Sequence, residues 1–293
     1  MAVKPLALLL ATLGCVHAAP PLPGQLPTGA QVVAGNAAIT SAGTVMTVTQ
    51  GTQRAAIDWA SFNVGSAAAV HFNQLQGAGS VTLNRVLDTN PSQIYGRITA
   101  PGQVFFTNPN GMYFAPGASV DVGGLVATTH RIGNDDFMAG RYLFERNGAT
   151  GSIINEGELK AALGGYIALL APEVRNRGVI LAQLGTVALA AGEAYELQIQ
   201  GQNTLANVIV EPATLNALVD NGHAVLAEGG LIILSARAAN QLQGGIVRNS
   251  GSLVASSLVE KGGRILLTGD DITLTSTSRI DASGATGGGQ VLV

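Results

Sequence analysis

From about residue 151 onwards the sequence repeats itself in units that are too short to hold a pair of helices. An Asn-x-Gly pattern occurs three times, at residues 155–157, 176–178 and 249–251. The first two copies are 21 residues apart. Repeats of this length are typical of solenoids, in which each unit packs only on its neighbours. The chain is therefore constrained to a stacked, elongated architecture over at least this region.

A second pattern lies between the Asn-x-Gly copies and consists of Gly followed by an apolar run. It occurs at residues 165–171, 185–191, 230–236 and 263–269. Apolar runs bounded by Gly and Asn indicate short strands joined by corners. Stacked coils of such strands, about 4.8 Å apart, form a parallel β-helix. Apolar side chains of these runs, for example Leu169 and Ile233, are expected to point into the coil. We expect the Asn side chains to stack along the axis and to hydrogen-bond the backbone of neighbouring coils. We also expect Gly178 to have a positive φ at its corner.

Composition agrees with an all-β fold and excludes two other classes. The chain has 39 Gly, and 11% of its residues are charged. Hydrophobic residues make up 47%, which is normal for a folded protein and excludes disorder. The net charge is −3 and no Lys/Arg cluster occurs, so nothing predicts a nucleic-acid partner.

Two regions depart from the repeat. Between about residues 192 and 229 we expect an excursion, which is a segment that leaves the coil and packs on its flank as a hairpin or sheet. Within it, residues 212–220 are predicted to form a short helix that ends at Asn221-Gly222. The less regular residues 26–114 are expected to start the β-helix and cap its open end. The chain stops within a strand pattern at residues 289–293, so we interpret it as a fragment of a longer protein.

The N-terminus predicts export. Lys4, an apolar run over residues 6–16 and small residues at Ala18 and Ala19 form a secretory signal peptide over residues 1–19. The run is too short to be a permanent membrane anchor. Cys15 is the only cysteine, so the mature chain has no disulfide and can pass through a pore as an extended polypeptide.

No motif of a known catalytic class occurs in the sequence. His71, His130 and His223 lie far apart and have no acidic neighbours at metal-ligand spacing. The acidic pairs Asp135-Asp136 and Asp270-Asp271 are interpreted as solvated loop carboxylates, since a cation or sugar-lyase site needs several converging oxygens. We therefore predict no catalytic residue, no metal and no cofactor. A polysaccharide-active β-helix enzyme stays as the alternative.

One stretch, FFTNPNGMYF at residues 105–114, places four aromatic residues around a single tight turn. Pro109 presets its own backbone angle, and Asn110-Gly111 tolerates positive φ, so the chain can turn sharply here. Two interpretations stay open. The turn is a corner of one coil sealed by aromatic side chains, or it is a recognition element.

Several blocks of this sequence resemble the two-partner secretion domain of filamentous-haemagglutinin-type exoproteins. The most specific block contains Asn108-Pro109-Asn110-Gly111, and the resemblance implies that it is a secretion motif. Other blocks are residues 59–65, 72–74, 83–86 and 122–127. The candidate recognition or cap residues taken from these blocks are Trp59, Phe62, Asn63, Asn73, Asn84 and Arg85.

The resemblance runs from about Gln31 to the end of the chain, and the domain is expected to span residues 20–293. It implies a right-handed parallel β-helix, all-β, with an N-terminal cap and an extra-helical excursion. It implies a cognate outer-membrane β-barrel transporter with POTRA domains, which binds the chain in the periplasm of a Gram-negative bacterium. The chain would fold outside the cell as the secretion domain of a non-enzymatic surface or secreted exoprotein. Adhesion to a host cell surface, or binding of a haem-carrying protein, would belong to the region downstream.

Overall fold

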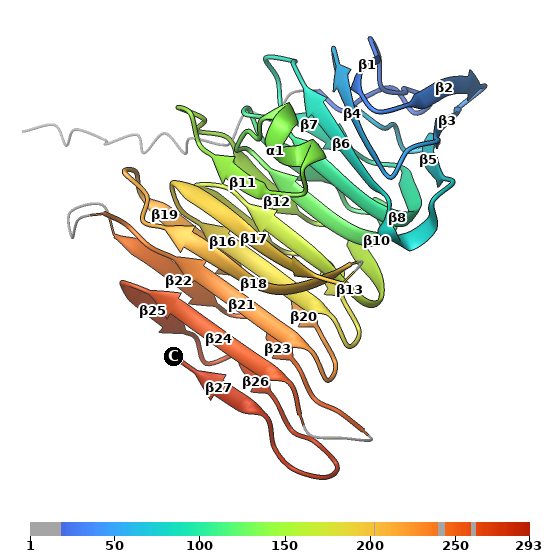
Figure 1. The fold of residues 1–293 in the computed structure, drawn as a ribbon. Coiled ribbons are helices and arrows are strands. Elements are labelled where there is room, and N and C mark those ends of the chain that lie inside the picture. Colours follow the sequence, from blue (N-terminus) through green and yellow to red (C-terminus); the bar gives the residue numbers. More distant parts are fainter. Residues whose placement is uncertain (1–18, 202, 240–243, 259–261) are drawn as a thin grey trace, which may run out of the picture.

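The computed structural model describes residues 19–201, 203–239, 244–258 and 262–293 (Figure 1). Residues 1–18 of the predicted signal peptide lie outside this range. Within the described residues, strands of successive coils stack in parallel into three faces of one elongated body. Each coil is a crossover between parallel strands of one sheet, a connection that is right-handed in nearly all proteins. The fold is therefore the parallel β-helix that the repeats predict, with the right-handed coil that the family resemblance implies.

Each coil contributes to the three faces in turn. The first face contains β5 (Ala69–Gln74), β15 (Val179–Leu181), β20 (Ala224–Leu226), β23 (Ser252–Val254), β26 (Arg279–Asp281) and the N-terminal parts of the long strands β8 (Arg97–Thr107), β10 (Ser119–Thr128) and β13 (Glu158–Leu170). The second face contains β6 (Val81–Val86), the C-terminal parts of β8, β10 and β13, then β16 (Thr186–Ala191), β21 (Leu231–Ala236), β24 (Arg264–Gly269) and β27 (Gln290–Leu292). The third face contains β7 (Ser92–Ile94), β9 (Met112–Phe114), β12 (Ser152–Asn155), β14 (Glu173–Asn176), β19 (Ala217–Asn221), β22 (Gly245–Asn249) and β25 (Asp271–Leu274). A 3₁₀ turn, η1 (Gly77–Gly79), joins β5 to β6.

A cap of two antiparallel pairs covers the N-terminal end, as expected. β1 (Gln31–Ala34) pairs with β4 (Arg54–Trp59), and β2 (Ala37–Ala42) pairs with β3 (Val45–Gln50). β3 and β4 then pair in parallel with β5 and β6 of the first coil. The cap thus occupies the sheet edge that would otherwise offer unpaired backbone groups.

The second face is buried on both sides. Leu169 and Ile232 pack in the interior, whereas Leu170 and Ile233 belong to a second, outer cluster. Successive side chains of a strand point to opposite sides, so a run such as Leu231–Ala236 must be apolar throughout when both sides are covered. Sequence analysis alone would place Ile233 inside the coil. Ile232 points into the interior, and the next residue of a strand points to the opposite side. Ile233 therefore packs on the outside.

The cover of the second face comes from two excursions. β17 (Ala194–Gln200) and β18 (Thr204–Glu211) form the expected antiparallel hairpin. A further excursion, residues 129–151, contains α1 (Asn134–Met138) and β11 (Tyr142–Glu145) and was not predicted. β11 pairs with β17 in an antiparallel manner, so the two excursions form one three-stranded sheet.

The predicted helix over residues 212–220 is wrong. This segment enters strand β19, which pairs in parallel with β14 and β22. Ala217, Val219 and Asn221 are buried in alternation with half-buried residues, the period of a strand. Neighbouring strands on both sides supply the backbone hydrogen bonds, and this outweighs the local helical pattern.

The Asn side chains stack along the axis as predicted, but the hydrogen bonds between successive members of the ladder run from side chain to side chain, and a fourth member joins the three. The Nδ2 of Asn155 donates to Asn176 Oδ1 at 2.8 Å, and that of Asn176 donates to Asn221 Oδ1 at 2.8 Å. Asn221 Nδ2 donates in turn to Asn249 Oδ1 at 2.7 Å. All four side chains are fully buried. The ladder therefore satisfies buried amides along the helix axis.

The Gly of the Asn-x-Gly corners has a different role from the expected one. Gly178 is absent from the positive-φ residues of the described chain, so the expectation of a left-handed corner is wrong. A Cβ on Gly178 would lie 2.1 Å from the carbonyl oxygen of Gly157, and one on Gly251 would lie 2.0 Å from that of His223. Gly is required because successive coils approach too closely for a side chain.

The first prediction tests the interior assignment. Leu169→Asp buries an unpaired carboxylate in the coil, so the chain should lose its cooperative unfolding transition and its β-type circular dichroism. Leu163→Asp is the matched control, because Leu163 lies on the same strand and is 67% exposed. Equal melting of the Leu169→Asp and unsubstituted chains would rule out the coil assignment.

The second prediction tests the close approach at the corners. Gly178→Ala should destabilise the chain by about 1–3 kcal/mol, since the methyl group forces the coils apart. Gly222→Ala should be nearly neutral, because its Cβ would lie 3.6 Å or more from its nearest neighbours. Urea unfolding of both variants measures the difference. A neutral Gly178→Ala would contradict the close-approach explanation.

Candidate functional site

Asn108 lies at the corner between β8 and β9 and is fully buried. Its Nδ2 donates to the carbonyl oxygen of Asn90 at 3.1 Å and to Ser92 Oγ at 3.0 Å. Its Oδ1 accepts from the backbone N–H of Asn110 at 3.0 Å. The side chain thus connects its own turn, through hydrogen bonds, to β7 and the loop before it in the preceding coil.

The other motif residues are more accessible. Pro109 is half-buried and Asn110 is exposed, with its Nδ2 donating to the carbonyl oxygen of Asp88 at 2.8 Å. Gly111 has a φ of +107°, and a Cβ there would lie 2.5 Å from the carbonyl oxygen of Ser152 in the next coil. The motif is therefore a corner that contacts the coils on both sides of it.

The aromatic residues near the motif form the interior of the first coils. Trp59 and Phe62 meet edge to face with ring centroids 5.1 Å apart, and Phe62 meets Phe106 at 4.8 Å. Trp59 Nε1 donates to Asn84 Oδ1 at 3.0 Å, and Asn84 Nδ2 donates to the carbonyl oxygen of Phe105 at 3.3 Å. Trp59, Phe62 and Asn84 are thus brought together, but inside the folded core.

The remaining candidate residues are separate from one another. Arg85 forms an ion pair with Asp58 at 2.7 Å and donates to Asn134 Oδ1 in α1 at 2.7 Å. Asn63 accepts from the backbone of β7 at 2.8 Å. Asn73 is exposed on β5. Arg85 thus anchors an excursion to the β-helix, while Asn63 and Asn73 lie in different surroundings.

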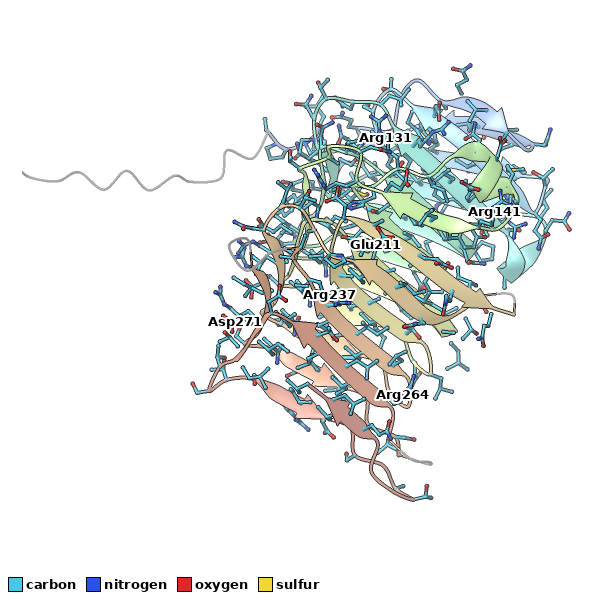
Figure 2. All side chains as sticks on the ribbon, turned by 60° about the vertical axis from the view of Figure 1, so that its left-hand side comes forward. Arg131, Arg141, Glu211, Arg237, Arg264 and Asp271 are labelled. Carbon is cyan, nitrogen blue, oxygen red and sulfur yellow. The ribbon has the colours of Figure 1, made fainter. Side chains whose placement is uncertain are left out.

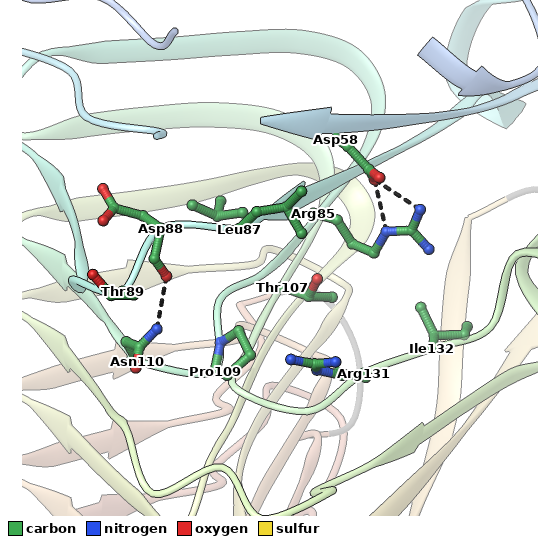
Figure 3. Close-up of a pocket in the computed structure, with 11 residues that line it drawn as sticks. Asp58, Arg85, Leu87, Asp88, Thr89, Thr107, Pro109, Asn110, Arg131 and Ile132 are labelled. Atoms are coloured by element: carbon green, nitrogen blue, oxygen red, sulfur yellow. Dashed lines mark hydrogen bonds and ion pairs between the residues drawn. The ribbon is translucent and has the colours of Figure 1, made fainter. Parts of the chain in front are cut away.

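A groove lies where the loops that follow β6, β8 and β10 meet (Figure 3). Its lining comes from all three loops and includes Arg85, Leu87, Asp88, Thr89, Thr107, Pro109, Asn110, Arg131 and Ile132. Two motif residues therefore form part of its wall. Sequence reasoning missed Arg131, because its place beside the motif depends on the stacking of β8 and β10.

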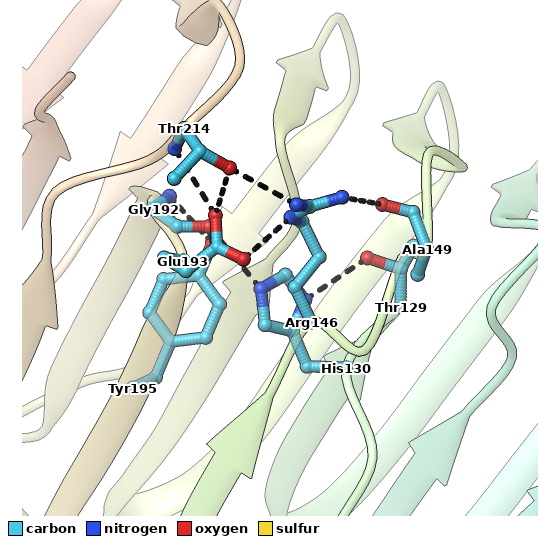
Figure 4. A network of polar contacts seen from close by, with 8 residues as sticks. All are labelled: Thr129, His130, Arg146, Ala149, Gly192, Glu193, Tyr195 and Thr214. Atoms are coloured by element: carbon cyan, nitrogen blue, oxygen red, sulfur yellow. Dashed lines mark hydrogen bonds and ion pairs between the residues drawn. The ribbon is translucent and has the colours of Figure 1, made fainter. Parts of the chain in front are cut away.

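A buried histidine joins the coil to the excursion hairpin (Figure 4). His130 Nε2 donates to the carbonyl oxygen of Gly192 at 3.2 Å, and its Nδ1 lies 3.2 Å from the hydroxyl of Thr129. The ring lies 4.5 Å from that of Tyr195. Burial lowers the pKa of His130 to about 4, although the hydrogen bond to Gly192 opposes this shift. His130 is therefore neutral at pH 7.

An ion pair beside His130 fastens the two excursions together. Arg146 Nε lies 3.0 Å from Glu193 Oε1, and Arg146 also donates to Thr214 Oγ1 at 3.0 Å. Thr214 donates its N–H and its hydroxyl to Glu193 Oε2. Burial alone would raise the pKa of Glu193, but the hydrogen bonds from Arg146 and Thr214 outweigh it and lower the pKa to about 2. No spacing in the sequence indicates this network, which joins residues 47 and 68 positions apart.

The acidic pairs do not converge on a site. Asp136 pairs with Arg141 at 2.7 Å, and Asp270 accepts from two backbone amides at 3.1 and 2.8 Å. Among the described residues, no group of three or more His, Cys, Asp or Glu side chains is placed to hold a metal ion. In the same part of the chain, no helix has the length and apolar character needed to cross a bilayer.

The chain is similar to known secretion domains. The model of the TPS secretion domain matches residues 24–282. Two curated heme/hemopexin-binding proteins of Haemophilus influenzae are 34% and 31% identical over 264 and 270 residues, or 87% and 84% of this chain. The chain spans 28% of the length of each. The crystal structure of the HMW1 secretion domain from Haemophilus influenzae matches with a TM-score of 0.74 and 28% identity, over 91% of this chain and 76% of that chain.

The third prediction concerns His130 and pH. The folded chain holds His130 neutral down to a pKa of about 4, whereas the unfolded chain binds the proton near pH 6.5. The free energy of unfolding should therefore fall as the pH falls from about 6.5, by about 2 kcal/mol between pH 7 and pH 5. Glu193 adds its own loss only below about pH 4.5, where the unfolded carboxylate is protonated.

Urea unfolding at pH 7 and at pH 5 measures this difference within each variant. His130→Gln should remove most of it, whatever its effect on stability at pH 7. His223→Gln should leave the difference unchanged, because His223 is exposed. An unchanged pH difference in His130→Gln would disprove the assignment.

Proposed function

Because the chain belongs to the TPS secretion domain family, we propose that it directs the export of a larger non-enzymatic exoprotein. A POTRA-bearing β-barrel transporter in the outer membrane recognises the chain in the periplasm. The chain crosses this transporter unfolded and folds on the outside as a β-helix. The absence of disulfides in the mature chain and its low charge support this route.

The observation that carries the proposal is the burial of several residues from the sequence blocks that resemble the family. In the folded chain Asn108, Trp59, Phe62 and Asn84 are inaccessible. A partner that reads these side chains must therefore bind before folding. An extended segment with unpaired backbone groups can also add a strand to the edge of a POTRA sheet. When the chain then folds outside the cell, these side chains and backbone groups become buried, which opposes return of the chain to the periplasm.

The exported protein as a whole is proposed to act in haem acquisition. The curated relatives are described as heme/hemopexin-binding proteins, which supports a haem-carrying host protein as partner. Adhesion to a host cell surface is the second candidate that the family resemblance implies. A polysaccharide-active enzyme is not favoured, since Asp136 and Asp270 are engaged in local contacts.

The fourth prediction separates recognition of the motif from its structural role. Asn110→Ala removes one exposed hydrogen bond and should cost about 1 kcal/mol or less, so the purified chain should still fold. If the transporter reads the motif, export by the cognate transporter should nevertheless fall sharply. Unchanged export of Asn110→Ala would count against recognition at this residue.

Asn108→Ala is the second variant of this export test. It leaves buried groups without partners and should cost about 2–3 kcal/mol, so its export needs a control of matched stability. Asn176→Ala is that control, because Asn176 is equally buried in the ladder and lies outside the motif. Export of Asn108→Ala should be the lower of the two. Equal loss in both variants would make the motif a corner only.

A further inference from the structure

The groove beside the motif has rigid walls. Asn110 holds the carbonyl group of Asp88 at 2.8 Å, and Asp88 Oδ1 accepts from the backbone N–H of Asn90 at 3.0 Å. On the opposite side, the backbone of Arg131 forms two hydrogen bonds with that of Glu145, at 2.8 and 2.9 Å. A ligand that enters the groove therefore meets backbone segments that are already held in place, and binding orders only exposed side chains of the lining.

The lining combines apolar side chains with one arginine side chain, Arg131, that forms no ion pair among the described residues. Leu87 is 65% exposed at the groove, and Pro109 and Ile132 add further apolar contacts. Arg85 is already paired with Asp58 at 2.7 Å. Arg131 is exposed, and within the described residues its guanidinium has no hydrogen-bond or ion-pair partner.

The placement of these groups selects one kind of ligand. Figure 3 shows Arg131 beside Pro109 and Thr107, with the carboxylate of Asp88 at the far side of the groove. A planar guanidinium suits a carboxylate, which it can hold through two parallel hydrogen bonds. Leu87 and Pro109 suit an adjacent apolar side chain. A single free cation is too little for a nucleic-acid backbone.

We propose that this groove in the folded chain binds an extended peptide of a partner protein, in which an acidic residue lies next to an aliphatic or aromatic one. The acidic side chain pairs with Arg131, and the apolar side chain packs on Leu87 and Pro109. The site goes beyond the role in export, because it exists only after folding. It does not depend on whether the transporter reads the motif.

A random dodecapeptide library displayed on phage, panned against the purified folded chain, tests the proposal. Enriched peptides should contain Asp or Glu next to an apolar residue. Their synthetic versions should bind the Arg131→Gln chain at least tenfold more weakly, as fluorescence anisotropy measures, and should also lose affinity for Leu87→Ser. Both substitutions are at exposed positions, and circular dichroism verifies that each variant is folded.

Arg264→Gln is the matched control, since it makes the same change of charge. Figure 2 shows Arg264 near the C-terminal end of the β-helix, far from Arg131 at the capped end. Its peptide affinity should be unchanged. The proposal is overturned if no peptide is enriched, if enriched peptides lack acidic residues, or if Arg131→Gln and Arg264→Gln bind them equally. Because no transporter is present, these outcomes leave the proposed role in export untouched.

Discussion

Each coil of this protein depends on the register in which it stacks on the coil before it. The buried ladder from Asn155 to Asn249 depends directly on that register, because each Nδ2 must meet the Oδ1 of the next Asn. A shift by one residue would leave several buried amides without partners and turn apolar side chains outwards. The Gly corners add a steric requirement, since at Gly178 only a residue without Cβ allows the coils to approach. Hydrogen bonding and close packing therefore specify the same register.

Stacking in this register leaves an apolar outer surface on the second face, and the excursions cover it. The second face is apolar towards the interior and towards the outside, so the bare β-helix would expose Leu170 and Ile233. The sheet of β11, β17 and β18 covers this outer surface. His130 and the Arg146–Glu193 ion pair fasten it in place. Because burial lowers the pKa of His130, the folded chain opposes its protonation, and acid therefore weakens this attachment of the cover.

The motif near the cap connects these structural demands to the proposed export. Asn108 and Asn110 hold the loop of the preceding coil, and Gly111 allows the close approach of the following one. Asn108 is fully buried in the folded chain, so a partner can reach it only while the chain is extended, whereas Asn110 stays exposed after folding. After folding, the corner presents a different surface, the groove that contains Arg131. One short segment thus has distinct chemical surroundings in the unfolded and folded chain.

The sequence by itself determined the parallel coils, the Asn ladder, the cap and the hairpin, because repeats and alternating patterns report on residues close together in the chain. It failed at β19, where a locally helical pattern gave way to parallel strands on both sides. It also assigned the wrong cause to Gly178 and the wrong side to Ile233. The His130 network and the place of Arg131 beside the motif were decided only by the tertiary structure. Asn176 and Asn221 are 45 residues apart and His130 and Gly192 are 62 apart, so only stacking and the packing of excursions bring such groups into contact.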